Sequence, residues 1–364
     1  MKVAAFEVKD YELKDFERAK AYGLDISLYA DNLSDENIEW VKGCEGITTL
    51  GFSDLSAPMI KKLSYAGVKY IATRTVGFNH IDLAACKKYG VRVSNAYYEP
   101  YNVADFAVML MLMLLRKAKI SVCRALVNDF SLDGMCGREM RNLTVGVIGA
   151  GKIGRAVIGN LQGFGCKILA YDPYAKDHAD GAEFVDLETI YRESDIITLH
   201  VPLTQSNHHM IDGAAIEKMK DGVLIINTAR GGLIDTDALI TALENEKVGG
   251  AGLDTIEAED GVAHIDLRAR IVNKRDIFYL KQFPNVIFTS HYAFFTEEAT
   301  SAMVECGLKS LAFFGEGRDN PFEINFIFYI NFLIIPKTGA PGGILPRGAL
   351  LYCPCKVRLK RQQG

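Results

Sequence analysis

A glycine-rich turn is the clearest candidate for chemistry in this sequence. Gly149, Gly151 and Gly154 directly follow the apolar run 144–148, and the residues after them have helical periodicity. In a strand–turn–helix unit, the first glycine allows a tight turn, the second lets a pyrophosphate approach the backbone, and the third lets the helix pack closely on the strand. The amide groups at the start of the helix then face the phosphates. The pattern therefore predicts a dinucleotide-binding site rather than a glycine turn without a ligand.

An acidic residue completes this pattern. A second apolar run, 167–171, ends at Asp172, about 20 residues beyond the glycines, where dinucleotide-binding proteins place an acid. A carboxylate at this position accepts hydrogen bonds from both hydroxyl groups of a ribose and repels a 2′-phosphate. We therefore expect NAD rather than NADP as the cofactor.

Polar residues follow four further apolar runs, which we predict to be parallel strands. The runs span 195–203, 222–229, 248–256 and 285–293. The polar and flanking residues near their ends are His200, Val201, Pro202, Asn227, Thr228, Arg230, Asp254, Glu257, Glu259 and His291. Ligands of an open parallel sheet bind at the carboxyl ends of its strands. We therefore expect an arginine, several acids and a histidine to converge on the crevice where a nicotinamide would lie.

These residue types suit the reduction of a 2-oxo acid. Arg230 can hold a carboxylate with two parallel hydrogen bonds, and it keeps its charge at any working pH. His291 is of a residue type that can donate a proton as the hydride arrives. A carboxylate on its other ring nitrogen, for which we select Glu259, would fix the tautomer of the ring. Two alternatives stay open from the residues alone: a surface salt bridge for Arg230, and a hydrogen-bonded core histidine for His291.

No metal site or disulfide framework is expected. The adjacent His208 and His209 lie in a predicted loop without other ligands, so we expect them to be solvated. His80, His178 and His264 belong to no recognisable constellation. Eight cysteines are scattered without a CxxC motif, which is typical of reduced thiols in a cytosolic protein.

The composition is that of a soluble globular protein with two domains. The chain has 364 residues, of which 49% are hydrophobic and 24% charged. The net charge of −4 gives no general attraction to nucleic acid or to anionic membranes. The first dozen residues contain acids and no long apolar run, so we expect a first β-strand rather than a signal peptide, and a cytoplasmic location.

The periodicity predicts an α/β architecture. Short apolar runs alternate with helical patterns from residue 1 to about 95, which favours a parallel sheet covered by helices on both faces. The stretch 102–120 is nearly all apolar and predicts a buried helix between two domains. Its unbroken apolar part, 106–115, is about half the 20 residues that a membrane span needs. A predicted helix after residue 296 would return the chain to the first domain.

The segment 326–364 differs from the rest of the chain. It joins an apolar run to a basic segment rich in proline and glycine, with six Lys or Arg residues and no acid. The run is too short to span a membrane, and the basic end would bind anionic surfaces weakly. We interpret the segment as an atypical tail, an appendage unrelated to the fold.

Six motifs in a fixed order resemble a known family. They are TRTVGFNHID at 73–82, LTVGVIGAGKIG at 143–154, SDIITLHVPLT at 194–204, MKDGVLIINTARGGLIDTDALI at 219–240, GGAGLDTIEAE at 249–259 and NVIFTSHYAFFTEEA at 285–299. Together they are similar to the D-2-hydroxyacid dehydrogenase family, and within it to the D-lactate dehydrogenase group that includes the vancomycin-resistance enzymes. The likeness extends from about residue 1 to residue 325.

The resemblance implies roles for individual residues. Arg230 would bind the carboxylate and ketone of the substrate, His291 would be the acid and base, and Glu259 would be its partner. The implied substrate-binding residues are Val76 and Gly77 through their backbone amides, Tyr98 in the pocket, and Arg230. The expected cofactor-binding residues are Gly149, Gly151, Lys152, Ile153, Gly154, Asp172, Val201, Pro202, Asn207, Thr228, Ala229 and Asp254, the last near the nicotinamide amide. Glu99 departs from the family, since relatives commonly have a serine there.

The resemblance also implies an organisation and an activity. A Rossmann NAD-binding domain of residues 100–299 would be inserted in a flavodoxin-like substrate domain of residues 1–99 and 300–325, both doubly wound, and the chain would form a homodimer. The implied activity is NADH-dependent reduction of a small 2-oxo acid, pyruvate to D-lactate first among them. Larger 2-oxo acids (2-oxoisocaproate, phenylpyruvate, 2-oxoglutarate), 3-phosphoglycerate oxidation, a nucleotide-sensing corepressor-like scaffold and an enzyme damaged by its tail are the alternatives. The set of Arg230, Glu259 and His291 weighs against a pure scaffold.

Overall fold

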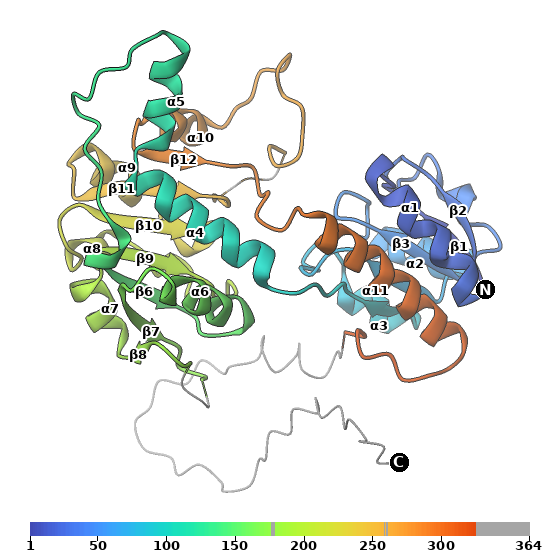
Figure 1. The fold of residues 1–364 in the computed structure, drawn as a ribbon. Helices are drawn as coiled ribbons and strands as arrows, with labels where there is room; N and C mark the ends of the chain where they lie inside the picture. The colour runs from blue at the N-terminus through green and yellow to red at the C-terminus, as the bar shows by residue number, and fades with distance from the viewer. Residues whose placement is uncertain (176–178, 258, 260, 325–364) are drawn as a thin grey trace, which may run out of the picture. The chain divides into compact units, whose positions relative to one another are not determined.

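The described chain folds around two parallel β-sheets (Figure 1). The computed structural model describes residues 1–175, 179–257, 259 and 261–324. The predictions for the tail 326–364 and for His178 fall outside these residues. The two sheets confirm the predicted α/β class with two parallel-sheet domains.

The first sheet has five parallel strands in the order β2-β1-β3-β4-β5. The strands are β1 (Lys2–Ala5), β2 (Asp25–Leu28), β3 (Gly46–Thr49), β4 (Tyr70–Thr73) and β5 (Arg92–Ser94), with helices α1 (Leu13–Phe16), α2 (Ala57–Tyr65) and α3 (Leu83–Tyr89) and the 3-10 helices η1 (Asp10–Glu12), η2 (Glu17–Tyr22) and η3 (Ile38–Val41) between them. Every residue of β3 is buried. This is expected of a central strand in a parallel sheet, which is covered on both faces.

A helix from the end of the described chain completes the first domain. α11 (Glu297–Gly315) packs against β4 and α1, and Figure 1 draws it beside α1. Its Leu308 and Leu311 share one buried core with Val3 and Ala5 of β1. Burial of each leucine contributes about 2 kcal/mol, which fixes the helix to the sheet. The chain thus returns to its first sheet, as the sequence predicts.

The second sheet has seven parallel strands in the order β12-β11-β10-β9-β6-β7-β8. Its elements are β6 (Thr144–Ile148), α6 (Lys152–Gln162), β7 (Lys167–Tyr171), β8 (Glu183–Phe184), α7 (Leu187–Glu193), β9 (Ile196–Leu199), α8 (Gly213–Glu217), β10 (Val223–Asn227), α9 (Thr236–Glu244), β11 (Val248–Leu253), α10 (Arg275–Gln282) and β12 (Val286–Phe288), with the 3-10 helices η4 (Met140–Asn142) and η5 (Gly231–Leu233). The chain goes from β6 to β7 on one side and returns to β9 on the other. Such a switch point is where open α/β sheets bind ligands.

The long apolar stretch is two helices rather than one. α4 (Tyr101–Leu115) buries residues such as Ala107, Leu110 and Met111 against the second sheet and α6. It ends because Lys117 has a φ of +50°, a left-handed conformation that cannot continue an α-helix. α5 (Ala118–Leu126) follows and has no buried residue. The prediction of one helix over 102–120 is therefore wrong at its end, since a local backbone turn breaks an apolar pattern that would allow continuation.

All four strands predicted from these apolar runs are shorter than the runs themselves. β9, β11 and β12 end at Leu199, Leu253 and Phe288, several residues before the ends of the runs. The remaining residues form loops at the carboxyl ends of the strands, and these loops carry His200, Asp254 and His291. Of the helices in the described part of the chain, none has the length and apolar content needed to cross a bilayer.

Candidate active site

The three fingerprint glycines are required for different reasons. Gly149 has a φ of +96°, and a Cβ there would lie 2.5 Å from the carbonyl oxygen of His200. A Cβ on Gly154 would lie 1.8 Å from the carbonyl oxygen of Gly149, so this glycine lets α6 approach the end of β6. Gly151 precedes α6, and a Cβ there would meet open space. The amides at the start of α6 therefore lie beside open space at Gly151, as a phosphate-binding turn requires.

Asp172 lies against this glycine turn. Its Oδ2 accepts a hydrogen bond of 2.9 Å from Ala150 N, and its Oδ1 accepts one of 2.8 Å from Tyr174 N. Each carboxylate oxygen keeps a second lone pair for a ribose hydroxyl. The carboxylate is thus held beside the turn at the end of β7, and the residues present fit an NAD molecule.

Lys152 and Ile153 open α6 in different ways. The ammonium of Lys152 lies 4.2 Å from the centre of the Tyr97 ring, a cation–π contact with the segment after β5. Ile153 packs its side chain against the buried core around α4 and α6. A contact of Ile153 with a cofactor would therefore come from its backbone amide rather than from its side chain.

The loop after β9 is folded by its own side chains. Val201 lies beside Gly149: a Cβ added to Gly149 would be 2.7 Å from Cγ1 of Val201. Asn207 Nδ2 donates to the carbonyl of Pro202 at 2.8 Å, and its Oδ1 accepts from Thr204 N at 2.7 Å. The structure therefore uses the side chain of Asn207 to close this loop.

A buried asparagine positions Arg230. Asn227, at the end of β10, donates from Nδ2 to the carbonyl of Arg230 at 2.9 Å and accepts from Ala229 N at 3.0 Å. The turn between them contains Thr228, whose buried Oγ1 has no hydrogen-bond partner among the described residues. Such an orphaned hydroxyl is available to a cofactor. Sequence reasoning placed Asn227 at a strand end but gave it no part in holding the turn.

The guanidinium of Arg230 lies next to the loop expected to hold the substrate carboxylate. A Cβ on Gly77 would be 2.9 Å from Nη2 of Arg230, while Nη1 donates to the carbonyl of Ala229 at 2.7 Å. The carbonyls of Val76 and Gly77 accept from Asn95 Nδ2 at 2.8 Å and Thr75 Oγ1 at 2.6 Å. Within the described residues the amides of Val76 and Gly77 have no acceptor. Two amides without acceptors among the described residues therefore lie close to a cation.

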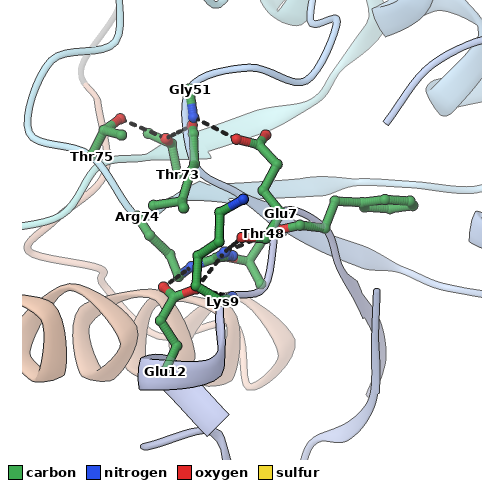
Figure 2. A network of polar contacts seen from close by, with 10 residues as sticks. Glu7, Lys9, Glu12, Thr48, Gly51, Thr73, Arg74 and Thr75 are labelled. Atoms are coloured by element: carbon green, nitrogen blue, oxygen red, sulfur yellow. Dashed lines mark hydrogen bonds and ion pairs between the residues drawn. The ribbon is translucent and has the colours of Figure 1, made fainter. Parts of the chain in front are cut away.

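A buried ionic network supports this loop (Figure 2). Arg74 and Glu12 are both fully buried, and Nε donates to Oε1 at 2.8 Å. Arg74 also donates from Nη2 to the carbonyl of Phe6 at 2.9 Å. This places a buried, hydrogen-bonded arginine directly before Thr75 and the carboxylate loop.

A second buried acid holds the neighbouring loop. The carboxylate of Glu7 accepts from the backbone amides of Gly51, Phe52 and Ser53 at 3.0, 2.9 and 2.8 Å. Figure 2 shows Glu7 pointing to Gly51. The residue itself has a φ of +60°, which costs energy and is sustained by these bonds. Sequence reasoning missed Glu7, Glu12 and Arg74, although charged residues at the ends of apolar runs were a signal for them.

His291 and Glu259 lie in direct contact. Nδ1 of His291 is 3.0 Å from Oε1 of Glu259, and both side chains are partly exposed. His291 has a φ of +61°, an uncommon conformation for a histidine. Glu257, the neighbouring acid, instead lies 2.8 Å from Nε2 of His209. Of the two acids, Glu259 is therefore the one that orients the His291 ring.

Asp254 holds the turn that carries His291. Its side chain is fully buried, with Oδ1 accepting from Thr289 Oγ1 at 2.6 Å and from Tyr292 N at 2.8 Å. Oδ2 accepts from Ala293 N at 2.9 Å, and the carbonyl of Asp254 accepts from His291 N at 2.8 Å. The structure thus gives Asp254 a part in fixing the His291 backbone. The place near the nicotinamide amide that the family resemblance implied for Asp254 stays a prediction.

Two aromatic residues and a second histidine line the same region. Burial raises the pKa of Tyr98 to about 12. The charge of Arg230 lowers this pKa and that of Asp254 raises it, and both effects are smaller than that of burial. Nε2 of His264 lies 2.9 Å from the carbonyl of His291, and its ring centre lies 6.3 Å from that of Phe52. The sequence assigned no constellation to His264, and this is wrong, because a partner 27 residues away along the chain was not visible in the pattern.

The comparisons with known proteins agree with this geometry. The family model described as D-isomer specific 2-hydroxyacid dehydrogenase, NAD binding domain, matches residues 108–293. The chain is 43% identical to an aromatic 2-oxoacid reductase of Clostridium sporogenes over 85% of its own length and 95% of that protein. It is 39% identical to D-lactate dehydrogenase of Escherichia coli over 89% of its length and 100% of that protein.

A solved structure shows the same fold. The structure of D-2-hydroxyisocaproate dehydrogenase superposes with a TM-score of 0.82 at 35% identity, covering 89% of this chain and 99% of that one. The family, the NAD cofactor and the oxidoreductase class predicted from the six motifs are thereby confirmed. The chain belongs to the D-isomer specific 2-hydroxyacid dehydrogenase family and is an NAD-dependent oxidoreductase of D-2-hydroxy acids.

Proposed function

We propose that this enzyme reduces pyruvate to D-lactate. The observation that carries the proposal is the approach of Arg230 to Gly77, where a Cβ would lie 2.9 Å from Nη2. Two backbone amides without acceptors and a permanent cation there suit the carboxylate of a 2-oxo acid. The role assigned below to each side chain is part of the proposal.

The chain's own residues would bind and protonate the substrate. Arg230 and the amides of Val76 and Gly77 hold the carboxylate, and the guanidinium polarises the ketone. When bound, NADH supplies the hydride that reaches the carbonyl carbon. His291 donates a proton from Nε2 to the carbonyl oxygen, so that the C=O bond becomes CH–OH. Glu259, 3.0 Å from Nδ1, holds the ring in place while the proton leaves Nε2.

The cofactor would be held by the elements around the switch point of the second sheet. We propose that the amides at the start of α6 face its pyrophosphate and that Asp172 accepts from its ribose hydroxyls. Thr228 offers a buried hydroxyl without a partner in the described part of the protein.

Phenylpyruvate-like 2-oxo acids are the second candidate substrates. The Phe52 side chain is 48% exposed, and its ring meets that of His264, which in turn contacts His291. An exposed ring beside the acid–base residue could stack on an aromatic substrate. The 43% identity to an aromatic 2-oxoacid reductase supports the same candidate.

A substrate panel tests the proposal. Purified enzyme and NADH would be mixed with pyruvate, 2-oxobutyrate, 2-oxoisocaproate, phenylpyruvate, 2-oxoglutarate and hydroxypyruvate, NADH absorbance followed, and the product resolved by chiral chromatography. We expect the highest kcat/KM on pyruvate with D-lactate as product. A higher value on phenylpyruvate would establish the second candidate. Bound NADH without turnover on any substrate would support a scaffold or an enzyme damaged by its tail.

The organisation of the chain is also a proposal. We infer a substrate domain of residues 1–99 and 300–325, a nucleotide domain of residues 100–299, a cytoplasmic location and a homodimer. Exposed apolar side chains in and after α5, including Val122, Leu126 and Phe130, support self-association. Light scattering on the purified protein would test the dimer, and a monomer at micromolar concentration would contradict it.

A further inference from the structure

Two histidines and a glutamate converge outside the proposed catalytic residues. Nε2 of His209 lies 2.8 Å from Oε1 of Glu257, and Nε2 of His208 lies 3.6 Å from the same oxygen. One ligand atom from each of the three residues falls within 4.8 Å of the others. The sequence predicted a solvated histidine pair without further ligands, and this is wrong, because Glu257 is 48 residues further along the chain.

The backbone holds this cluster in place. His209 has a φ of +54°, and its amide donates to the carbonyl of Gly232 at 2.9 Å. The two histidine rings lie with their centres 3.9 Å apart. The backbone of Glu257 lies close to Gly231, since a Cβ added to Gly231 would be 2.3 Å from Glu257 N. The loops after β9, β10 and β11 therefore meet at this point.

Two outer groups lie near two of the three side chains. Oδ2 of Asp235 lies 3.7 Å from Nδ1 of His209, the ring nitrogen opposite Glu257. Thr236 Oγ1 lies 3.5 Å from Oε2 of Glu257, the oxygen that faces away from the histidines. A carboxylate behind a histidine is a common second partner at metal sites, because it favours the tautomer in which the other ring nitrogen is a free ligand.

We propose that His208, His209 and Glu257 bind a divalent cation of borderline softness, of the Zn²⁺ and Co²⁺ class. Ligand atoms about 2.0–2.1 Å from a tetrahedral ion lie about 3.4 Å apart, and the two separations from Glu257 Oε1, 2.8 and 3.6 Å, bracket this value. Small rotations of the exposed His208 ring complete the arrangement. Water fills the remaining coordination position.

The donor set decides which cations fit. Two imidazoles with one carboxylate suit zinc, cobalt and nickel, whereas magnesium and calcium prefer oxygen ligands throughout. The side chains of His208, His209 and Glu257 are 50%, 31% and 34% exposed, so an ion can enter from solvent. The site stands independently of the proposed substrate and of the proposed catalytic roles.

Cobalt titration of the full-length protein tests the site. Visible absorption reports Co²⁺ bound by nitrogen and oxygen, while thiolate ligands add charge-transfer bands in the near ultraviolet, so binding at cysteines is distinguished. We expect one Co²⁺ per chain without thiolate bands, displaced by Zn²⁺ and not by excess Mg²⁺. His208→Ala and Glu257→Gln should each weaken binding about tenfold or more, the size of effect seen when metal-site partners are removed.

The control keeps the test specific. Glu188→Gln removes one exposed carboxylate that pairs with Lys218, and it should leave Co²⁺ binding unchanged. Circular dichroism of each variant establishes that it is folded, and the two site variants act on different loops, so a folding failure in one leaves the other informative. Unchanged binding in a folded site variant, thiolate bands alone, displacement by Mg²⁺ or an equal loss in Glu188→Gln would each overturn the proposal.

Discussion

Nδ1 of His291 lies 3.0 Å from Oε1 of Glu259, and the two residues come from separate loops at the carboxyl edge of the second sheet. The histidine backbone is held at a positive φ by Asp254, so neither its position nor its ring orientation is left free. A proton donor that is fixed before the substrate arrives loses little entropy in the reaction.

Glu259→Gln should lower kcat roughly ten- to hundredfold, since a hydrogen bond to a charged group is worth about 1.5–3 kcal/mol. The glutamine amide can present either its oxygen or its NH₂ group to Nδ1, so the ring loses its single orientation. NADH affinity, measured by fluorescence titration, should stay the same. Glu188→Gln serves as the matched control, and equal kcat values in the two variants would remove Glu259 from the proton-transfer role.

Arg230→Lys should raise KM for the 2-oxo acid and lower kcat together. A lysine ammonium cannot form two parallel hydrogen bonds to a carboxylate, and it does not reach the point that Nη2 occupies beside Gly77. The expected loss in kcat/KM is roughly ten- to hundredfold, from one charge-assisted bond worth about 1.5–3 kcal/mol. Steady-state kinetics with each 2-oxo acid would measure it, and unchanged constants would place Arg230 outside the site.

Asp172→Asn should weaken the preference for NADH over NADPH. The asparagine keeps the shape of the side chain and one acceptor for the amides of the glycine turn, but it removes the charge that repels a 2′-phosphate. We expect the ratio of kcat/KM values for the two cofactors to fall about tenfold, equivalent to about 1.4 kcal/mol. A ratio that stays at the wild-type value would show that Asp172 does not face the ribose.

Local patterns predicted the parts of the site that depend on neighbouring residues. The glycine turn and Asp172 could be predicted because they lie at short, fixed spacings along the chain. At Gly149 and Gly154 the backbone leaves no room for a side chain, so only glycine fits these positions. The contact of Glu259 with His291 was expected because parallel strands end at one edge. The break between α4 and α5 at Lys117 was not predicted, because a single residue in the left-handed conformation does not change the hydrophobic periodicity.

Contacts between distant segments escaped the sequence analysis. Arg74 pairs with Glu12, 62 residues earlier, and Glu257 pairs with His209, 48 residues earlier. No repeat or spacing links such residues, because their contact depends on the order of strands in the sheets. Buried polar partners are therefore the part of this site that only the folded structure reveals.

Glu12→Gln should destabilise the protein by about 3–5 kcal/mol, because it leaves the fully buried guanidinium of Arg74 without its counter-charge. Glu45→Gln is the matched control, since Glu45 pairs with Lys69 on the surface, where solvent screens the ion pair and its loss changes stability little. Urea unfolding followed by circular dichroism would give both values. Equal losses in the two variants would contradict the structural importance of the buried pair.

His200 should make the stability of the protein depend on pH. Burial lowers its pKa to about 3 from the ordinary value of 6.5, and its Nε2 lies 2.9 Å from Thr198 Oγ1. Between these two values the unfolded chain binds a proton that the folded chain does not, so the free energy of unfolding falls as the pH is lowered from 6.5 toward 3. Above pH 6.5 neither the folded nor the unfolded chain binds this proton, so His200 no longer makes the stability depend on pH. In His200→Gln the fall over this window should be smaller, and urea titrations at several pH values would measure it. A fall as steep as that of the wild type would mean that other groups account for the acid sensitivity.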